Sequence, residues 1–376
     1  MSGGAKHLYV HIPFCASRCD YCDFVSMTGH PDQHARYVDA LLAELELERD
    51  LLAPELDTVY LGGGTPSYLE PEALRRLLEG LPAAGELTVE ANPETVTPRL
   101  TELLVEAGVN RVSLGAQSFQ PRLLDVLGRR AGPGDIRRAI ETLREVGIDN
   151  LSLDLLYGIP GQGRRDLDAD LDETLALAPE HLSCYELEAK PGTRFSHAHG
   201  AELLEQADAL EDQLELIVER LSASGYRWYE TANFARIEPR RDLRSVHNLG
   251  YWRGHDYLGI GIGAVSTVAC SRRRNLPSLL RYLEALERGE KPPRETEALD
   301  ERTKLRERLM LGLRLDEPVA IAELESVLDR GALERFSDLG LVRVENGMMT
   351  LSTHGRMLGG AVCAELIVWS DETLAA

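Results

Sequence analysis

Six short runs rich in β-forming residues alternate with helical stretches in the first half of the chain. The runs are HLYVHI (7–12), DTVYLGGG (57–64), ELTVEANP (86–93), NRVSLGAQS (110–118), NLSLDLLYG (150–158) and HLSCYELE (181–188). Segments with helical periodicity, such as 33–52 and 134–147, lie between them. Repeated strand–helix units predict parallel strands wrapped by helices. Because six units fall short of eight, the predicted fold is α/β, a partial (β/α)6 TIM-like barrel with a lateral opening for a large substrate.

Polar or glycine-rich residues follow nearly every one of these runs. They are Cys15 to Cys22, Gly62 to Thr65, Glu90 to Pro93, Gln117 and Asp154. Barrels of this kind gather their chemistry at the carboxyl ends of the strands. We therefore expect these residues to face one site.

The chain divides into three expected parts: a barrel over 1–235, a barrel-covering segment and connector over 236–300, and a C-terminal domain over 301–376. The last part reads as helix, helix, short hairpin and helix, which resembles a winged helix. Winged helices often bind DNA, but residues 301–376 carry 9 Lys or Arg against 13 Asp or Glu. That balance argues against duplex binding.

Composition narrows the class of protein further. Of the 376 residues, 43% are hydrophobic, which supports a sizeable core. The formal net charge of −21 disfavours nucleic acid as a partner and gives no indication of peripheral membrane contact. The sequence shows no leader and no apolar run long enough to cross a bilayer, so we expect a cytoplasmic protein.

Three of the six cysteines, Cys15, Cys19 and Cys22, form C-x3-C-x2-C directly after the first run. In a reducing compartment such crowding indicates metal binding rather than disulfides. One interpretation is zinc, completed by His11 or His30, although no second Cys or His pair follows downstream. The other is a [4Fe-4S] cluster held by three thiolates, whose fourth iron is free to bind an exchangeable ligand.

C-x3-C-x2-C after an opening strand resembles the radical S-adenosylmethionine (SAM) superfamily. In that superfamily the amino and carboxylate groups of SAM chelate the open iron, and reductive cleavage yields a 5′-deoxyadenosyl radical. LYVHIPFCASRCDYCDF (8–24), GGGTP, EANP, GAQSF and LDLLYGIPGQ follow in the order of one family within it. That family comprises the oxygen-independent coproporphyrinogen III oxidases and the related HemW-type haem chaperones. The resemblance implies a [4Fe-4S] cluster and SAM as cofactors.

The resemblance also implies the residues that bind SAM. The glycine-rich turn would meet the methionyl ammonium group, and Arg129 would pair with the methionyl carboxylate. Glu90 and Asp154 would accept hydrogen bonds from ribose or ammonium groups, and Tyr21 would pack on the adenosyl part. The full set is Tyr9, Tyr21, Gly63, Gly64, Thr65, Glu90, Gln117, Arg129 and Asp154. Taken one at a time, each also fits a structural role, such as a tight turn at the glycines.

HNLGYW (247–252) resembles the H-N-x-x-Y-W signature of the HemW proteins, where it is associated with haem binding. In a helix His247 and Tyr251 share one face, and a neutral imidazole is a common ligand of haem iron. The alternative is a buried histidine capped by Asn248 beside packed Tyr251 and Trp252. The run 272–274, three arginines, could meet haem propionates, although such runs are more often solvated loops.

Two departures from the oxidase branch favour the chaperone branch. Phe24 stands where oxidases carry a fourth cysteine, and we expect no long N-terminal extension before the first strand. The favoured function is therefore a haem chaperone that binds the cluster, SAM and haem, and passes haem to acceptor proteins such as respiratory enzymes. The alternatives are a coproporphyrinogen III oxidase and a zinc-stabilised interaction module with a winged-helix tail.

Overall fold

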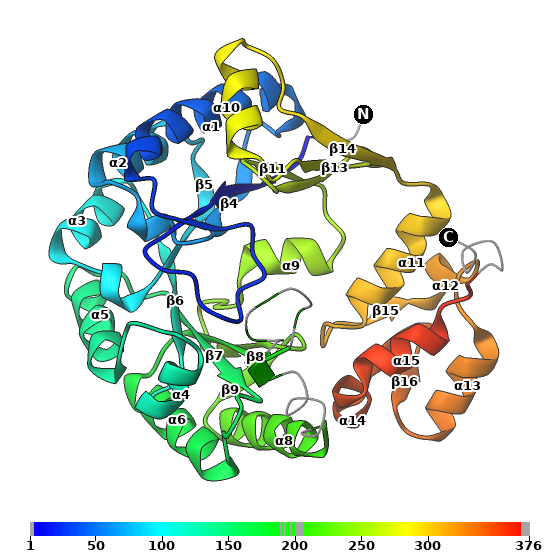
Figure 1. The fold of residues 1–376 in the computed structure, drawn as a ribbon. Coiled ribbons are helices and arrows are strands. Elements are labelled where there is room, and N and C mark those ends of the chain that lie inside the picture. The colour runs from blue at the N-terminus through cyan, green and yellow to red at the C-terminus, as the bar shows by residue number, and fades with distance from the viewer. Residues whose placement is uncertain are drawn as a thin grey trace.

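The computed structural model describes residues 4–188, 190, 193, 195, 198–199 and 207–369. Figure 1 shows strands surrounded by an arc of helices, with the C-terminal helices on the side where that arc is open. No helix among the described residues combines the length and apolarity needed to cross a membrane.

One large sheet forms the framework, in the order β14-β13-β12-β11-β1-β4-β5-β6-β7-β8-β10-β9. The six predicted runs are confirmed as its parallel strands β1 (His7–Ile12), β4 (Leu56–Gly63), β5 (Ala84–Ala91), β6 (Arg111–Gln117), β7 (Leu151–Tyr157) and β8 (His181–Glu186). Their carboxyl ends lie at one edge, because all six run in the same direction. The partial α/β barrel expected from the sequence is therefore present.

Helices connect these strands and cover the outer face of the sheet. They are α1 (His34–Glu48), α2 (Pro71–Gly80), α3 (Pro98–Glu106), α4 (Pro121–Val126), α5 (Pro133–Glu145), α6 (Arg164–Leu177) and α8 (Ala207–Ala223). Short 3-10 turns are η1 (Pro31–Gln33), η2 (Arg49–Leu51), η3 (Pro66–Tyr68) and η4 (Pro93–Thr95). The central strands are buried on both faces, as the all-buried pattern of Arg111–Ala116 in β6 shows.

The segment from 236 to 300 differs from the expectation. It was expected to cover the open side and then act as a connector. Instead β11 (Tyr257–Ile260) pairs in parallel with β1, and β12 (Val265–Val268), β13 (Ser271–Asn275) and β14 (Arg294–Ala298) continue the sheet. The three arginines at 272–274 therefore lie on strand β13 rather than in a loop. Segment 271–275 is a strand because its backbone pairs with β12 on one side and β14 on the other. Its polar sequence shows no apolar alternation that would have predicted a strand.

Two strands that precede this segment, β9 (Tyr226–Trp228) and β10 (Asn233–Arg236), extend the sheet at its β8 edge. Within the segment, α10 (Leu279–Glu287) packs beside α1. Helix α9 (Val246–Trp252) carries HNLGYW and lies inside the arc (Figure 1).

The C-terminal region has a hydrophobic core of its own. Its elements are α11 (Glu301–Gly312), β15 (Val319–Ala320), α12 (Ile321–Leu324), α13 (Arg330–Asp338), β16 (Val342–Glu345), β17 (Met348–Leu351), α14 (Thr353–Met357) and α15 (Gly359–Leu366). Most buried apolar side chains from Leu309 to Ile367 form a cluster separate from that of the barrel, whereas Leu315 packs with Tyr229, Ala235, Leu243 and Leu249. The hairpin β16–β17 joins β15 in a three-stranded sheet. Assignment of this region to the winged-helix class stays a prediction.

Polar contacts tie the C-terminal region to the barrel. The Arg356 guanidinium donates to the carbonyl of Trp228 at 2.7 Å and lies 3.8 Å from the centre of its ring. Arg314 pairs with the buried carboxylate of Glu230 at 2.7 Å. Arg314 also lies 4.4 Å from the centre of the Trp252 ring, so the contacts join the C-terminal region to β9, to the turn after it and to α9.

Candidate functional site

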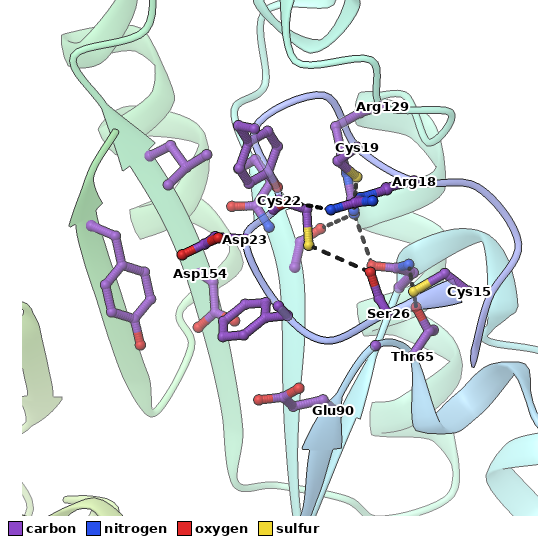
Figure 2. A pocket seen from close by; sticks show the side chains of 18 of the residues that line it. Cys15, Arg18, Cys19, Cys22, Asp23, Ser26, Thr65, Glu90, Arg129 and Asp154 are labelled. Carbon is purple, nitrogen blue, oxygen red and sulfur yellow. Dashed lines mark hydrogen bonds between the residues drawn. The ribbon is translucent and has the colours of Figure 1, made fainter. Parts of the chain in front are cut away.

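A pocket of about 450 Å³ lies at the carboxyl ends of the parallel strands. Figure 2 shows its wall, with the three cysteine thiols on one side and the carboxylates of Glu90 and Asp154 on the other. Of the fourteen candidate site residues, eleven line this pocket, and the three others are Tyr9, His247 and Tyr251. The pocket thus lies at the carboxyl ends of the parallel strands, as the sequence predicted.

The cysteines lie on the loop that follows β1. Cys15 ends the short strand β2 (Phe14–Cys15), which pairs with β3 (Met27–Thr28) and so closes the loop. Each sulfur faces a polar group. Thr65 Oγ1 donates to Cys15 Sγ at 3.5 Å, Arg129 Nη1 donates to Cys19 Sγ at 3.6 Å, and the Cys22 Sγ lies 4.0 Å from Ser26 Oγ.

This donor set fits an iron–sulfur cluster. Thiolate ligands are its usual protein ligands, and hydrogen bonds to sulfur tune its potential. Burial raises the pKa of the Cys15 thiol to about 11, so the bare thiolate is unfavourable there, whereas a coordinated thiol is deprotonated outright. The loop is therefore suited to sulfurs that are bound to metal.

The zinc interpretation lacks its proposed fourth ligand at His11. Its Nε2 lies 2.8 Å from the carbonyl oxygen of Val25, and its Nδ1 lies 3.0 Å from the hydroxyl of Tyr9.

The glycine-rich turn after β4 lets the backbone approach its neighbours. A Cβ on Gly64 would lie 3.0 Å from Cys15 Sγ and 2.8 Å from the carbonyl oxygen of Ile12. Gly63 has φ +110°, and a Cβ there would lie 2.4 Å from the His11 ring. Glycine is thus required at both positions by the local packing.

Glu90 and Asp154 place two carboxylates in the pocket wall. Burial raises the pKa of Glu90 to about 7, and the charge of Asp154 adds to the rise. Its oxygens accept from the Tyr60 hydroxyl at 2.7 Å and from the Gly63 N–H at 3.0 Å. Burial raises the pKa of Asp154 to about 6, although Ser113 donates to it at 3.2 Å. A ligand with ammonium or hydroxyl donors would stabilise both carboxylates in their charged form.

Arg129 and Gln117 are aimed by backbone features that the sequence did not reveal. Arg129 Nη2 donates to Gly115 O at 2.7 Å and to Asn92 Oδ1 at 3.0 Å, which holds the guanidinium beside Cys19. Gln117 has φ +68° at a register shift between β6 and β7. Such bulges re-aim side chains next to functional sites.

Sequence reasoning missed several residues of the pocket. Ser113 lines it and donates to Asp154, and Tyr185 and Lys190 lie on the β8 side. Asn92, by contrast, belongs to the predicted Glu90–Pro93 set. Ser113 lies on β6, two positions before Gly115, on the same face of the strand. Strand alternation was therefore the signal that could have identified Ser113.

Tyr9 lies apart from this pocket. Its ring stacks 6.2 Å from that of Tyr60 inside the barrel, and it lines a smaller pocket with Phe24 and Val25. A direct role in SAM binding stays a prediction that this placement does not favour.

His247 and Tyr251 do not line this pocket; His247 is buried and Tyr251 is half-buried. His247 is 2% exposed, and its Nδ1 and Nε2 lie 2.7 Å from Thr58 Oγ1 and 3.0 Å from the Tyr251 hydroxyl. Burial lowers the pKa of His247 to about 3, so the ring is neutral. The backbone N–H of His247 donates to Glu86 Oε1 at 3.0 Å. The ring is therefore satisfied, and binding of haem iron would require it to give up one partner.

A family model described as the radical SAM superfamily matches residues 9–174. This range contains the three cysteines, the glycine turn and both pocket carboxylates. Together with the barrel, it defines a radical SAM protein, a class that implies a [4Fe-4S] cluster and SAM.

Curated relatives define the family more narrowly. The heme chaperone HemW of Bacillus subtilis is 31% identical over 376 residues, covering 95% of this chain and 98% of that protein. The heme chaperone HemW of Mycobacterium tuberculosis is 36% identical over 382 residues, covering 98% and 96%. The chain belongs to the heme chaperone HemW family.

Among solved structures, the coproporphyrinogen III oxidase HemN of Escherichia coli is similar. It matches with a TM-score of 0.80 and 25% identity, covering 96% of this chain and 90% of that one. The two proteins thus share the arrangement of nearly the whole chain.

Proposed function

We propose that this protein is a haem chaperone, which binds haem and delivers it to acceptor proteins. The observation that carries the proposal is the similarity to proteins named heme chaperone HemW, which extends over at least 95% of this chain in two bacteria. Phe24 at the position of a fourth cysteine and the HNLGYW run support the same branch. Respiratory enzymes are the proposed acceptors, in a cytoplasmic setting that suits the six free cysteines.

The pocket residues support a resident cluster with SAM. Cys15, Cys19 and Cys22 would hold the cluster, and bound SAM at a reduced cluster would supply radical chemistry. Arg129 would bind the methionyl carboxylate, and the turn at Gly63 and Gly64 would accept the close approach of the ammonium group.

The remaining proposed contacts are with the ribose and adenine. Glu90 and Asp154 would accept hydrogen bonds from donors of SAM, and their raised pKa values favour a ligand that carries positive charge. Tyr21, Thr65 and Gln117 line the same pocket, so they can contact the nucleoside.

The second candidate is coproporphyrinogen III oxidation. Its support is the structural likeness to E. coli HemN over 96% of this chain. The two functions differ in turnover, because an oxidase converts many porphyrinogen molecules whereas a chaperone binds and releases haem unchanged.

One anaerobic preparation can separate them. The reconstituted protein is assayed for iron and sulfide, titrated with haemin, and mixed with apomyoglobin to follow haem transfer by absorbance. A second sample receives coproporphyrinogen III, SAM and a reductant. We expect haemin binding and transfer without protoporphyrinogen. Multiple turnovers to protoporphyrinogen, or no haemin binding at all, would overturn the proposal.

A further inference from the structure

A second cavity, of about 720 Å³, lies between α11 and the β11–β13 strands; we call it the α11 groove. Its wall includes Tyr251 of the HNLGYW helix, and Leu299, Leu305 and Leu311 supply apolar surface. Ligand sites are typically about 300–1,000 Å³ and mostly apolar with a few polar groups. The groove therefore has the size and lining for a porphyrin.

The groove also carries cations that suit two propionates. Lys304 and Arg308 line it, and within the described residues neither has a carboxylate partner. Arg272 is instead paired with Glu307 at 2.7 Å. The other acidic groups of the groove are Asp256, which accepts from the Ala269 N–H, and Glu301. The two unpaired cations match the two carboxylates of haem.

His255 is the imidazole in this groove. It is exposed, in contrast to His247, and its ring stacks 5.4 Å from that of His7. Its Nδ1 lies 3.1 Å from His7 Nε2, and in the part of the chain that the structure describes its Nε2 has no partner. Burial and the nearby Arg253 lower the pKa of His255, which keeps the ring neutral.

A chain of hydrogen bonds connects His255 with the HNLGYW motif. His7 Nδ1 lies 2.9 Å from Thr58 Oγ1, which lies 2.7 Å from His247 Nδ1, and His247 Nε2 lies 3.0 Å from the Tyr251 hydroxyl. Each neutral imidazole carries one N–H, and the Thr58 hydroxyl can accept from one ring while it donates to the other, so all protons of the chain can point the same way. When they point toward Tyr251, His255 donates from Nδ1 and its Nε2 offers a lone pair to the groove.

The motif is packed tightly against this chain. A Cβ on Gly250 would lie 2.7 Å from His7 Nε2, so only glycine lets α9 approach that ring. A hydrogen bond from the second ring nitrogen is the usual device that fixes the tautomer of a metal-bound histidine.

We propose that haem binds in the α11 groove with His255 as its iron ligand, and that His247 is a positioning residue acting through Thr58 and His7. The proposal rests on the haem-chaperone function proposed above. Iron at His255 Nε2 selects the proton order in which His255 donates to His7.

Haemin titrations of the full-length, cluster-loaded protein test the proposal. We expect His255→Ala to weaken haemin binding by more than about ten-fold and to abolish the absorbance and resonance Raman bands of a histidine-ligated haem. His247→Gln should retain most of the binding but change the iron–histidine stretching frequency. Lys304→Glu with Arg308→Glu should weaken binding without removing the histidine signature.

Matched controls exclude a general loss of structure. His354 on α14 is exposed and lies outside the groove, so His354→Ala should leave haemin binding unchanged. Iron and sulfide contents should be the same in every variant. Cys270→Ser is included because Cys270 also lines the groove, with Lys304 Nζ 3.5 Å from its sulfur.

The outcomes separate this inference from the function itself. If the unaltered protein binds no haemin, the proposed function fails. If it binds haemin and His255→Ala binds equally well, the inference fails and the function survives. Loss of the haem ligand only in His247→Gln, or only in Cys270→Ser, would assign the iron to that other residue and also overturn the inference.

Discussion

The cysteine pocket and the HNLGYW helix both carry specific sequence motifs, but the side chains of the two motifs differ in their access to a cavity. Around the pocket, the motif residues Cys19, Glu90 and Arg129 face a cavity. On α9, His247 is 2% exposed and both of its ring nitrogens have partners. The strand-end motifs thus line a pocket, whereas the histidine of the helical motif is enclosed by other side chains.

The first test removes a ligand from the pocket side of this comparison. We expect Cys19→Ser to lose the cluster, with iron and acid-labile sulfide falling to background, because only three thiolates are available to hold it. Colorimetric analysis of anaerobically reconstituted protein measures both. The matched change is Cys270→Ser, an exposed cysteine outside the loop, which should retain full iron. Equal iron in both variants would contradict the cluster assignment.

The second test concerns Arg129, which joins Cys19 Sγ, Asn92 and Gly115 O. Arg129→Ala should weaken SAM binding about 10- to 100-fold, because the pocket loses both the carboxylate partner and a hydrogen bond to sulfur. Calorimetric titration of reconstituted protein gives the affinity. Arg130 is the exposed neighbour of Arg129, and Arg130→Ala is the control. Similar losses of SAM affinity in the two variants would show that the affinity depends on net charge and not on the contacts of Arg129.

The third test concerns the buried side of the comparison. His247 has a pKa lowered to about 3, against an unfolded value of 6.5, so the unfolded chain binds its proton first as pH falls. The contribution of His247 to the free energy of unfolding is fully present above pH 6.5 and decreases as the pH falls toward 3. Between pH 7.5 and pH 5 this amounts to about 2 kcal/mol.

Urea unfolding of cluster-free protein at the two pH values measures that difference. His247→Gln should reduce the pH dependence by about this amount, apart from any uniform loss of stability. The exposed His354 provides the control, since His354→Gln should leave the slope as it is. An unchanged slope in His247→Gln would mean that the imidazole is open to water.

The smallest expected effect is at Phe24, which is 66% exposed at the pocket. Phe24→Ala should change the free energy of unfolding by less than about 0.5 kcal/mol, because little apolar surface is buried there. By contrast, Phe14 is 0% exposed. Phe14→Ala should therefore lower the free energy of unfolding by about 3–5 kcal/mol. Denaturant titrations compare the two, and a large loss at Phe24 would place it in the core.

Local patterns accounted for the framework of the molecule. The six parallel strands from β1 to β8 were predicted, since β-branched and apolar runs between amphipathic helices leave few alternatives, whereas the parallel strand β11 was not. The strands β13 and β14 were missed because Ser271–Asn275 and Arg294–Ala298 are mostly polar and lack the apolar alternation that marks a strand. The register shift that aims Gln117 was missed for a similar reason, because no residue type announces a bulge.

By itself the sequence determined the strands of the barrel, the cysteine loop and the glycine turn. Each depends on only a few neighbouring residues: the alternation of side chains along a strand, the spacing of the cysteines, and the absence of a Cβ in glycine. Only the tertiary structure decided that His247 is enclosed while His255 is exposed, although the two lie in the same short stretch of chain. Exposure and hydrogen-bond order depend on His7 and Thr58, which come from β1 and β4, far away in the sequence. Such contacts between distant segments leave no periodic trace in the chain.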